Sequence, residues 1–331
     1  MRRRPTTPVL ELVAALALFI GPPPLLGPTI AWGDPAHAWV GGGGGILASA
    51  DGGATWQVQT RAPARELVAL GPGHAWALSD QGVTLRTTDG VRWRPLGVQH
   101  LLRLTFGDAR TGFGLDRDDF VLKTTDSGKT WRPTGGPQRV QSICFVDTRT
   151  GWVARNGTVW TTHDAGAHWR ARTLMPYRQG FPIPELFCHG NDVWIVFHSG
   201  AAAGTEGYRI FRSLDRGAMW RAVFASFEVK LPMVSNYSGP ISVIGAGAAV
   251  LEGSCSPCGY GSVTLVRTSN GGRTFARTTF RNTSPGPVAF VDHLRGFAVL
   301  TPLPHGLPTI YRTLDGGRTW RRVLSSELLK E

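Results

Sequence analysis

The chain has 331 residues, is rich in glycine (43) and tryptophan (12), and only 18% of its residues are charged. This composition argues against a helical protein and favours turn-rich, aromatic-rich β structure. The formal net charge of +12 suits nucleic acid, an acidic protein or an anionic membrane surface as a partner.

The N-terminal segment has the order of a secretory signal. Three arginines, Arg2 to Arg4, precede an apolar run from Val9 to Ile20, and Gly21 and Pro22 break that run. The run is about 12 residues long, short of the roughly 20 that span a bilayer. We expect residues 1–27 to be a cleaved signal peptide or an uncleaved N-terminal membrane segment, and the protein to be exported, either extracytoplasmic or secreted.

The next feature is a turn motif that recurs along the rest of the chain. Its clearest copies are Ser49 to Trp56, Thr124 to Trp131 and Thr313 to Trp320, with the pattern Ser/Thr-x-Asp-x-Gly-x-Thr-Trp. The copy Thr87 to Trp93 is one residue short. The seven copies place their Asp or Asn and their aromatic residue at Asp51 and Trp56, Asp89 and Trp93, Asp126 and Trp131, Asp164 and Trp169, Asp215 and Trp220, Asn270 and Phe275, and Asp315 and Trp320.

Each position of the motif has a structural reason. The Asp and Ser/Thr side chains satisfy backbone N–H groups of a hairpin turn, the glycine takes a left-handed conformation, and the Trp packs on the sheet. An apolar strand with alternating pattern and a central aromatic, such as Ala38-Trp39-Val40, precedes most copies. The motif Asp residues therefore have a structural role and no catalytic one.

One repeat contains four strands, exemplified by Leu101 to Phe106, Thr111 to Leu115, Phe120 to Thr125 and an outer strand from Trp131. Such a sheet buries both faces only by stacking against its neighbours until the ring closes. We predict one all-β domain over residues 28–331, a seven-bladed β-propeller with four-stranded antiparallel blades. Pro28 to Trp32 is the first inner strand, and the tail from Ser325 is expected to be peripheral.

Arginine recurs directly after the motif Trp, which favours a structural cause for much of the positive charge. At the start of an outermost strand, a charge discourages edge-to-edge pairing between molecules. We prefer this reading to a nucleic-acid groove and expect no nucleic-acid partner. The residues are Arg94, Arg132, Arg170, Arg221 and Arg321.

The motif and the strand before it resemble the BNR or Asp-box repeat, and the resemblance covers nearly all of the chain after residue 27. Sialidases, xyloglucan-active hydrolases and sortilin-type receptors share this repeat. The spacing of motif and preceding strand is most similar to the Ycf48/HCF136-type photosystem II assembly factors. That resemblance implies a non-enzymatic scaffold that binds a membrane-protein partner on the far side of a membrane. We also expect the protein to be a monomer without cofactor or metal.

A glycan-active enzyme or a carbohydrate-binding propeller is the alternative. Sialidases carry a Phe/Tyr-Arg-Ile-Pro motif, whereas the nearest strings here are Phe181 to Pro184, without the Arg, and Tyr208 to Ile210, without the Pro. Folding can still assemble a Tyr and carboxylate pair. Glu185, Glu206, Tyr177 and Tyr237 could form such a catalytic pair, and the alternative is that they are ordinary surface side chains.

The later repeats are longer, and the extra length falls in connections that open on one face. The segments are 175–184, 199–207, 226–239, 252–261 and 301–308. Insertions on one face indicate a binding surface, although variable surface loops are the alternative. The predicted partner-binding residues are Tyr177, Arg178, Phe181, His198, Glu206, Tyr208, Lys230, Tyr237, Tyr260 and His305.

The four cysteines suit disulfides in an exported chain. We predict a bridge between Cys255 and Cys258 within one connection. Cys144 and Cys188 fall on adjacent predicted inner strands, and the sequence allows either a disulfide between them or two buried free thiols. A zinc site would need a second Cys pair close by.

Overall fold

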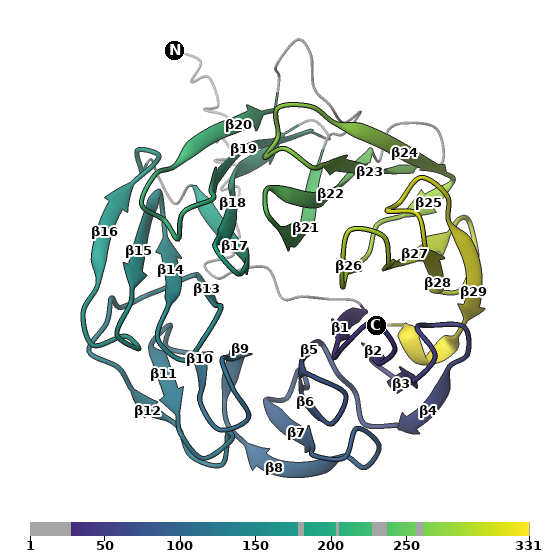
Figure 1. Ribbon diagram of the computed structural model, residues 1–331, viewed down its shortest axis with the longest axis horizontal. Helices are drawn as coiled ribbons and strands as arrows, with labels where there is room; N and C mark the ends of the chain where they lie inside the picture. Colours follow the sequence, from purple (N-terminus) through teal and green to yellow (C-terminus); the bar gives the residue numbers. More distant parts are fainter. Residues whose placement is uncertain (1–27, 178–181, 203–204, 227–236, 256–260, 331) are drawn as a thin grey trace, which may run out of the picture.

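Seven antiparallel sheets are arranged radially around a central axis (Figure 1). The computed structural model describes residues 28–177, 182–202, 205–226, 237–255 and 261–330. Each sheet is one blade, and its strands follow one another in the chain from the axis outward. This architecture confirms the predicted seven-bladed β-propeller.

The blades follow the chain in order. The first four consist of β1 (Thr29–Trp32), β2 (Ala38–Gly42), β3 (Gly45–Ser49) and β4 (Gln57–Thr60); β5 (Glu66–Leu70), β6 (His74–Leu78), β7 (Val83–Thr87) and β8 (Arg94–Val98); β9 (Leu101–Phe106), β10 (Gly112–Asp116), β11 (Val121–Thr124) and β12 (Arg132–Pro133); and β13 (Ser142–Phe145), β14 (Gly151–Arg155), β15 (Thr158–Thr162) and β16 (Arg170–Thr173). The last three consist of β17 (Ile183–His189), β18 (Asp192–Ala202), β19 (Thr205–Ser213) and β20 (Arg221–Ala225); β21 (Tyr237–Gly245), β22 (Ala248–Cys255), β23 (Ser262–Thr268) and β24 (Ala276–Arg281); and β25 (Thr283–Ser284), β26 (Val288–Phe290), β27 (Gly296–Pro302), β28 (Thr309–Thr313) and β29 (Arg321–Ser325).

The turn between the third and fourth strands of a blade is held by its own side chains. In the first blade, Asp51 Oδ1 accepts hydrogen bonds from the backbone N–H groups of Ala54 and Thr55, both at 2.9 Å. The Ser49 hydroxyl oxygen accepts from the Gly53 N–H at 2.8 Å. Because the bonds from the Thr55 hydroxyl and N–H favour the ionised carboxyl, they hold the pKa of Asp51 well below its usual range.

Aromatic pairs between neighbouring blades form the core. A buried ring on the second strand of one blade stacks on a ring of the next inner strand, as in Trp76 on Phe106 (3.7 Å between centroids) and Phe113 on Phe145 (3.6 Å). Burying one such side chain contributes about 2 to 3 kcal/mol. The interfaces between blades are therefore the hydrophobic core of the molecule.

The ring closes through the same kind of contact, without a shared strand. Trp32 of β1 stacks on Phe297 of the last blade at 4.2 Å, and its Nε1 donates to the Ala289 carbonyl at 3.1 Å. In the last blade the innermost position is divided between β25 and β26, which both pair with β27. This blade therefore departs from the predicted four strands.

The C-terminal tail contributes to closure, so the expectation of a peripheral tail was wrong. The short 3-10 helix η1 (Glu327–Leu329) packs on the first blade, where Leu329 is fully buried. The Gly43 N–H donates to the Lys330 carbonyl at 2.8 Å, and the Gly44 N–H donates to the Leu328 carbonyl at 3.1 Å. Burial of the apolar Leu329 side chain is favourable, because it removes apolar surface from water, and this burial holds the tail against the first blade.

The outermost strands begin with exposed arginines, as the sequence predicted. Arg94, Arg132, Arg170, Arg221 and Arg321 are the first residues of β8, β12, β16, β20 and β29. Each lies on an edge strand whose outer side has no partner strand within the described residues. Their position fits protection of these edges against pairing with another molecule.

Candidate functional site

The inner strands surround a cavity on the propeller axis, which we call the axial cavity. Its volume is about 570 Å³, and residues of β1, β5, β9, β13, β17, β21 and β26 line it. Most of the lining is apolar. The charged or titratable side chains in it are Arg65, Glu66, Arg103, Glu185 and His198.

One group of charges joins the second and third blades. The Arg65 guanidinium donates to the carbonyls of Ser79 (3.1 Å) and Leu101 (3.0 Å). Glu66 Oε2 accepts from the Leu104 N–H at 3.3 Å. Burial raises the pKa of Glu66, and the charges of Arg103 and Arg65 act against that rise. Arg65 and Glu66 thus have structural partners, whereas Arg103 contributes its positive charge to the cavity.

A second group centres on His198 of β18. Its Nδ1 lies 2.7 Å from Glu206 Oε1, and its Nε2 lies 3.7 Å from Glu185 Oε2. Burial alone would lower the pKa of His198, but its contacts with Glu185 and Glu206 raise it to about 9. Glu206 Oε2 also accepts from the Ser238 N–H at 3.0 Å, which connects the fifth and sixth blades. A protonated imidazole between two carboxylates therefore lies at the cavity wall.

A further carboxyl group, Glu252 of β22, lies behind this wall. It is only 2% exposed, and its Oε1 has no hydrogen-bond partner in the described part of the chain. A Cβ added to Gly239, which lines the cavity, would collide with the Glu252 carboxyl group. Burial first, and the charge of Glu185 second, raise the pKa of Glu252 to about 8. Glu252 therefore keeps its proton to a higher pH than an exposed glutamic acid does.

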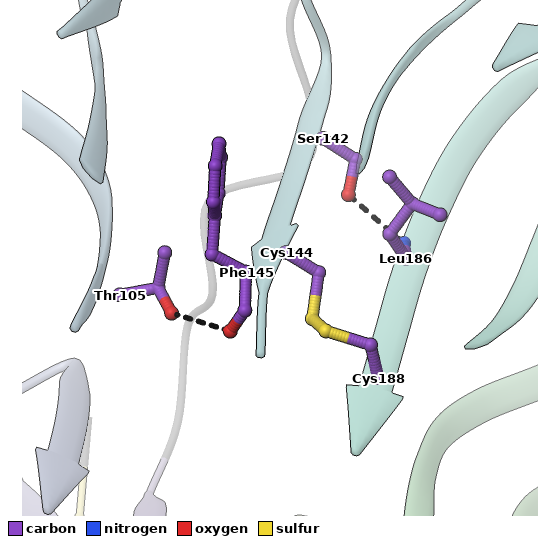
Figure 2. The surroundings of a disulfide bond; sticks show 6 residues. All are labelled: Thr105, Ser142, Cys144, Phe145, Leu186 and Cys188. Carbon is purple, nitrogen blue, oxygen red and sulfur yellow. Dashed lines mark hydrogen bonds between the residues drawn. A yellow bond between two sulfur atoms is a disulfide. The ribbon is translucent and has the colours of Figure 1, made fainter. Parts of the chain in front are cut away.

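A disulfide crosses the cavity wall between the fourth and fifth blades. Cys144 of β13 and Cys188 of β17 are bonded, and Figure 2 shows them side by side on the two inner strands. Above the disulfide, the Leu186 N–H donates to the Ser142 hydroxyl oxygen at 2.9 Å. Cys255 is also disulfide-bonded, and Cys258, its predicted partner, lies outside the described residues.

The structure brings together only some of the predicted partner-binding residues. His198 and Glu206 form the ion pair described above, and Tyr237 begins β21 next to Ser238. Tyr177 is 55% exposed near the outer strand β16, and His305 is exposed in the turn between β27 and β28. Arg178, Phe181, Lys230 and Tyr260 lie outside the described residues.

Two expectations about this face need correction. Tyr208 is only 2% exposed and packs between the fifth and sixth blades with Ile210 and Ile241, so it is not a surface anchor. Much of the extra length in these blades forms strand and not loop: β18 has 11 residues, whereas β10 has 5. The extension occurs because Ala201 and Ala202 continue the pairing of β18 with β19.

The propeller is similar to several solved structures. YCF48 bound to D1 peptide matches with a TM-score of 0.57 and 15% identity, over 93% of this chain and 96% of that chain. The GH74 enzyme of Niastella koreensis matches with a TM-score of 0.64 and 14% identity, over 88% of this chain and 53% of that chain. An ancestral GH74 enzyme matches with a TM-score of 0.52 and 11% identity, over 91% and 46%.

This chain shares the fold of these propellers. It spans about half of each GH74 enzyme and nearly all of the YCF48 chain. No protein-family model and no curated protein matches its sequence. Within the described ranges, no cluster of three His, Cys, Asp or Glu side chains is arranged to hold a metal ion. Those same ranges contain no helix with the length and apolar character needed to cross a membrane.

The sequence analysis missed Arg65, Glu66 and Arg103 in the lining of the axial cavity, and Glu252 behind its wall. A signal was present in each case. Arg103 interrupts the apolar strand Leu101 to Phe106, and Glu252 follows the run Ala248 to Leu251. A charged residue within an inner or second strand of a propeller points toward the axis or into a blade interface, where charge is costly without a purpose.

Proposed function

We propose that this protein is an exported, non-enzymatic β-propeller that binds a segment of a membrane-protein partner and acts as a scaffold or assembly factor. The observation that carries the proposal is the axial cavity, where all seven inner strands meet and where Arg103 presents a positive charge. The fold likeness to YCF48 bound to D1 peptide supports a protein partner. No cofactor takes part, and the scaffold acts as a monomer.

The cavity suits an extended peptide better than a globular surface. Its volume of about 570 Å³ falls in the range of small-ligand pockets, about 300 to 1,000 Å³. Apolar side chains such as Ile30 and Ile183 line it between the charged groups, and this combination favours a chain segment with one acidic and some apolar side chains.

Export is supported by the basic and apolar N-terminal segment and by the cysteines. The Cys144–Cys188 bond joins two strands of the native fold, and Cys255 is also oxidised. Disulfides of this structural kind persist in oxidising compartments. The segment 1–27 serves as a cleaved signal or as a membrane tether.

The test is a photo-crosslinking pull-down from membranes of the source cell with the mature protein as bait. The decisive variant is Arg103→Glu, and the matched control is Arg132→Glu, which makes the same charge change on an exposed outer strand. We expect the wild type and the control to recover one membrane protein that Arg103→Glu does not recover. Recovery of no membrane protein by the wild type would refute the function, and equal recovery by Arg103→Glu would refute the site.

A glycan-active enzyme is the second candidate, because Glu185 in the cavity lining and Glu252 behind it have opposite pKa shifts. The pKa of Glu252 is raised, and the contact with His198 lowers the pKa of Glu185 although burial opposes it. Glycosidases use such a pair, with one protonated and one ionised carboxyl group. However, Glu252 is 2% exposed behind Gly239, which leaves a sugar no access to it.

Hydrolysis assays separate the two candidates. Sialosides and xyloglucan are incubated with the wild type and with Glu185→Gln, which retains the side-chain shape. Turnover by the wild type that Glu185→Gln abolishes would establish the enzyme. Under the scaffold proposal, both proteins leave these substrates intact.

A further inference from the structure

The turn motif of the second blade lacks one specific residue. In the other six turns, the residue after Asp or Asn has a positive φ and its N–H donates to the carbonyl of an earlier turn, as Ser127 does to Arg110. Gly90 makes the equivalent bond to the Gly73 carbonyl at 3.0 Å. Gly90 is followed directly by Val91, so the missing residue is the second glycine of the motif.

That second glycine makes two kinds of contact, each of them in some of the other blades. Its carbonyl accepts the indole N–H of the motif Trp, as in Trp131 to Gly128 (3.1 Å) and Trp169 to Gly166 (2.9 Å). It also covers the second-strand aromatic of the preceding blade, because a Cβ on Gly53 would collide with the Phe297 ring and one on Gly217 would collide with Trp152.

Without this glycine, Gln59 of the first blade replaces its contacts. Gln59 Oε1 accepts hydrogen bonds from Trp93 Nε1 (2.8 Å) and from Trp39 Nε1 (3.0 Å), and its Nε2 donates to the Gly90 carbonyl at 2.8 Å. Trp39 is the second-strand aromatic that the missing glycine would cover. The side chain of Gln59 satisfies these polar atoms but does not fill the space.

The result is a cavity between the first and second blades, which we call the junction cavity. Residues of β4 and β8 and of the turns of both blades line it, and its volume is about 1010 Å³. The corresponding junction of the sixth and seventh blades, which has the full-length turn with Gly317, has a cavity of about 200 Å³. The junction whose turn lacks one residue therefore has a cavity about five times larger than the junction with the full-length turn.

The polar lining of the junction cavity is balanced in charge. Asp51 and Asp89 contribute two carboxylates, and Arg92 and Arg94 contribute two guanidinium groups. His37 also lines the cavity, and its Nδ1 is paired with the Asp34 carboxylate at 2.9 Å. Asp89 Oδ1 receives the bonds of its turn, while its Oδ2 receives no hydrogen bond from a described residue. The two guanidinium groups are exposed and form no hydrogen bond or ion pair with the described residues. Unused acceptors and donors thus lie in one cavity of zero net charge.

The apolar lining completes the chemistry. Trp93 is half-buried on one wall, and Val58 and Val91 are 50% and 60% exposed at the rim. A sugar hydroxyl both donates and accepts hydrogen bonds, and the C–H face of a pyranose ring packs on an indole, as other apolar groups do. An anionic or cationic ligand would gain little from a lining whose charges cancel.

We propose that the junction cavity is a binding site for a neutral oligosaccharide. The pyranose rings pack against Trp93 between the two valines, and their hydroxyl groups bind Asp89 Oδ2 and the guanidinium groups of Arg92 and Arg94. This site lies between the first two blades, apart from the axial cavity, and is independent of the proposed scaffold function.

The experiment measures binding of cellotriose, xylotriose, maltotriose and N,N′,N″-triacetylchitotriose by saturation-transfer NMR and calorimetry with the whole protein. The first variant inserts a glycine between Gly90 and Val91, which restores the full-length turn. The second is Arg94→Ala, with Arg132→Ala, at the same position of the third blade, as its control. Val58→Glu at the exposed rim is a third variant that leaves the core unchanged.

We expect at least one trisaccharide to bind the wild type and Arg132→Ala equally. Arg94→Ala and Val58→Glu should weaken binding about tenfold, equivalent to about 1.4 kcal/mol, and the glycine insertion should abolish it while the melting temperature stays the same or rises. If no trisaccharide binds at millimolar concentration, or if both Arg94→Ala and Val58→Glu bind as the wild type does, the proposal is refuted.

Discussion

Removal of the Cys144–Cys188 disulfide should destabilise the propeller without changing its fold. The bond joins adjacent inner strands of two blades, and its cysteines are 44 residues apart in the sequence. A double variant, Cys144→Ala with Cys188→Ala, removes the bond without adding a polar group to the half-buried wall of the axial cavity. The native hydrogen bond from the Leu186 N–H to the Ser142 hydroxyl remains.

The magnitude follows from the loop that the bond closes. In the chain-entropy model, a loop of this length contributes about 4 kcal/mol to the free energy of unfolding at 25 °C. The unfolding entropy of a domain of about 300 residues is about 0.6 kcal/mol/K, so the double variant should melt about 6 °C lower. The loss arises in the unfolded chain, which gains conformational freedom when the bond is absent.

Urea unfolding followed by tryptophan fluorescence measures this effect with and without dithiothreitol. The reductant should lower the midpoint of the wild type and of Cys255→Ala, and should lower that of the double variant less, because the double variant retains only the disulfide of Cys255. Cys255→Ala is the matched control, because it removes the other oxidised cysteine. Equal midpoints for the wild type and the double variant under oxidising conditions would contradict the entropic reasoning.

Three further changes test the buried charges and the ring closure. Burial raises the folded-state pKa of Glu252 from its ordinary value of 4.5 to about 8, so the free energy of unfolding should be highest below pH 4.5 and should decrease as pH rises through 8. Glu252→Gln should remove this loss, which is about 3 kcal/mol at pH 7, in urea unfolding across pH 4 to 9. His198, with a pKa raised from 6.5 to about 9, contributes stability that is full below pH 6.5 and lost through pH 9, so His198→Asn should destabilise the protein at pH 6 and have a smaller effect at pH 10. Leu329→Ala should cost about 3 kcal/mol, measured by the same unfolding assay, whereas an unchanged midpoint would show that the tail does not contribute to closure.

The blade architecture was predictable because its signals are local. The turn motif, exemplified by Ser49 to Trp56, and the strand that contains Trp39 lie within about 20 residues of each other, and period-two alternation defines each strand. The first inner strand was also placed correctly, since Thr29–Trp32 is β1. Repetition then fixed the number of blades.

The site was harder to predict because it depends on contacts between distant strands. The extension of β18 through Ala202 depends on its pairing with β19, which no local composition reveals. The sequence predicts Tyr208 as a partner-binding residue, although its spacing from Ile210 places both side chains on one buried face of the strand. The contact of His198 with Glu185 and Glu206 requires the folded sheet.

The absence of a strand shared between the first and last blades has a consequence for how the molecule is made. Every blade is one uninterrupted stretch of sequence, so each sheet can form as soon as its own residues have been synthesised. Trp32 can stack on Phe297 only after the last blade has been made. The N–H groups of Gly43 and Gly44 can bond the carbonyls of Lys330 and Leu328 only after the C-terminal tail has been made. Before the C-terminal residues are made, the blades form an open arc whose first and last blades each lack a neighbour. The chain is therefore most exposed to proteolysis and aggregation until Leu329 packs against the first blade.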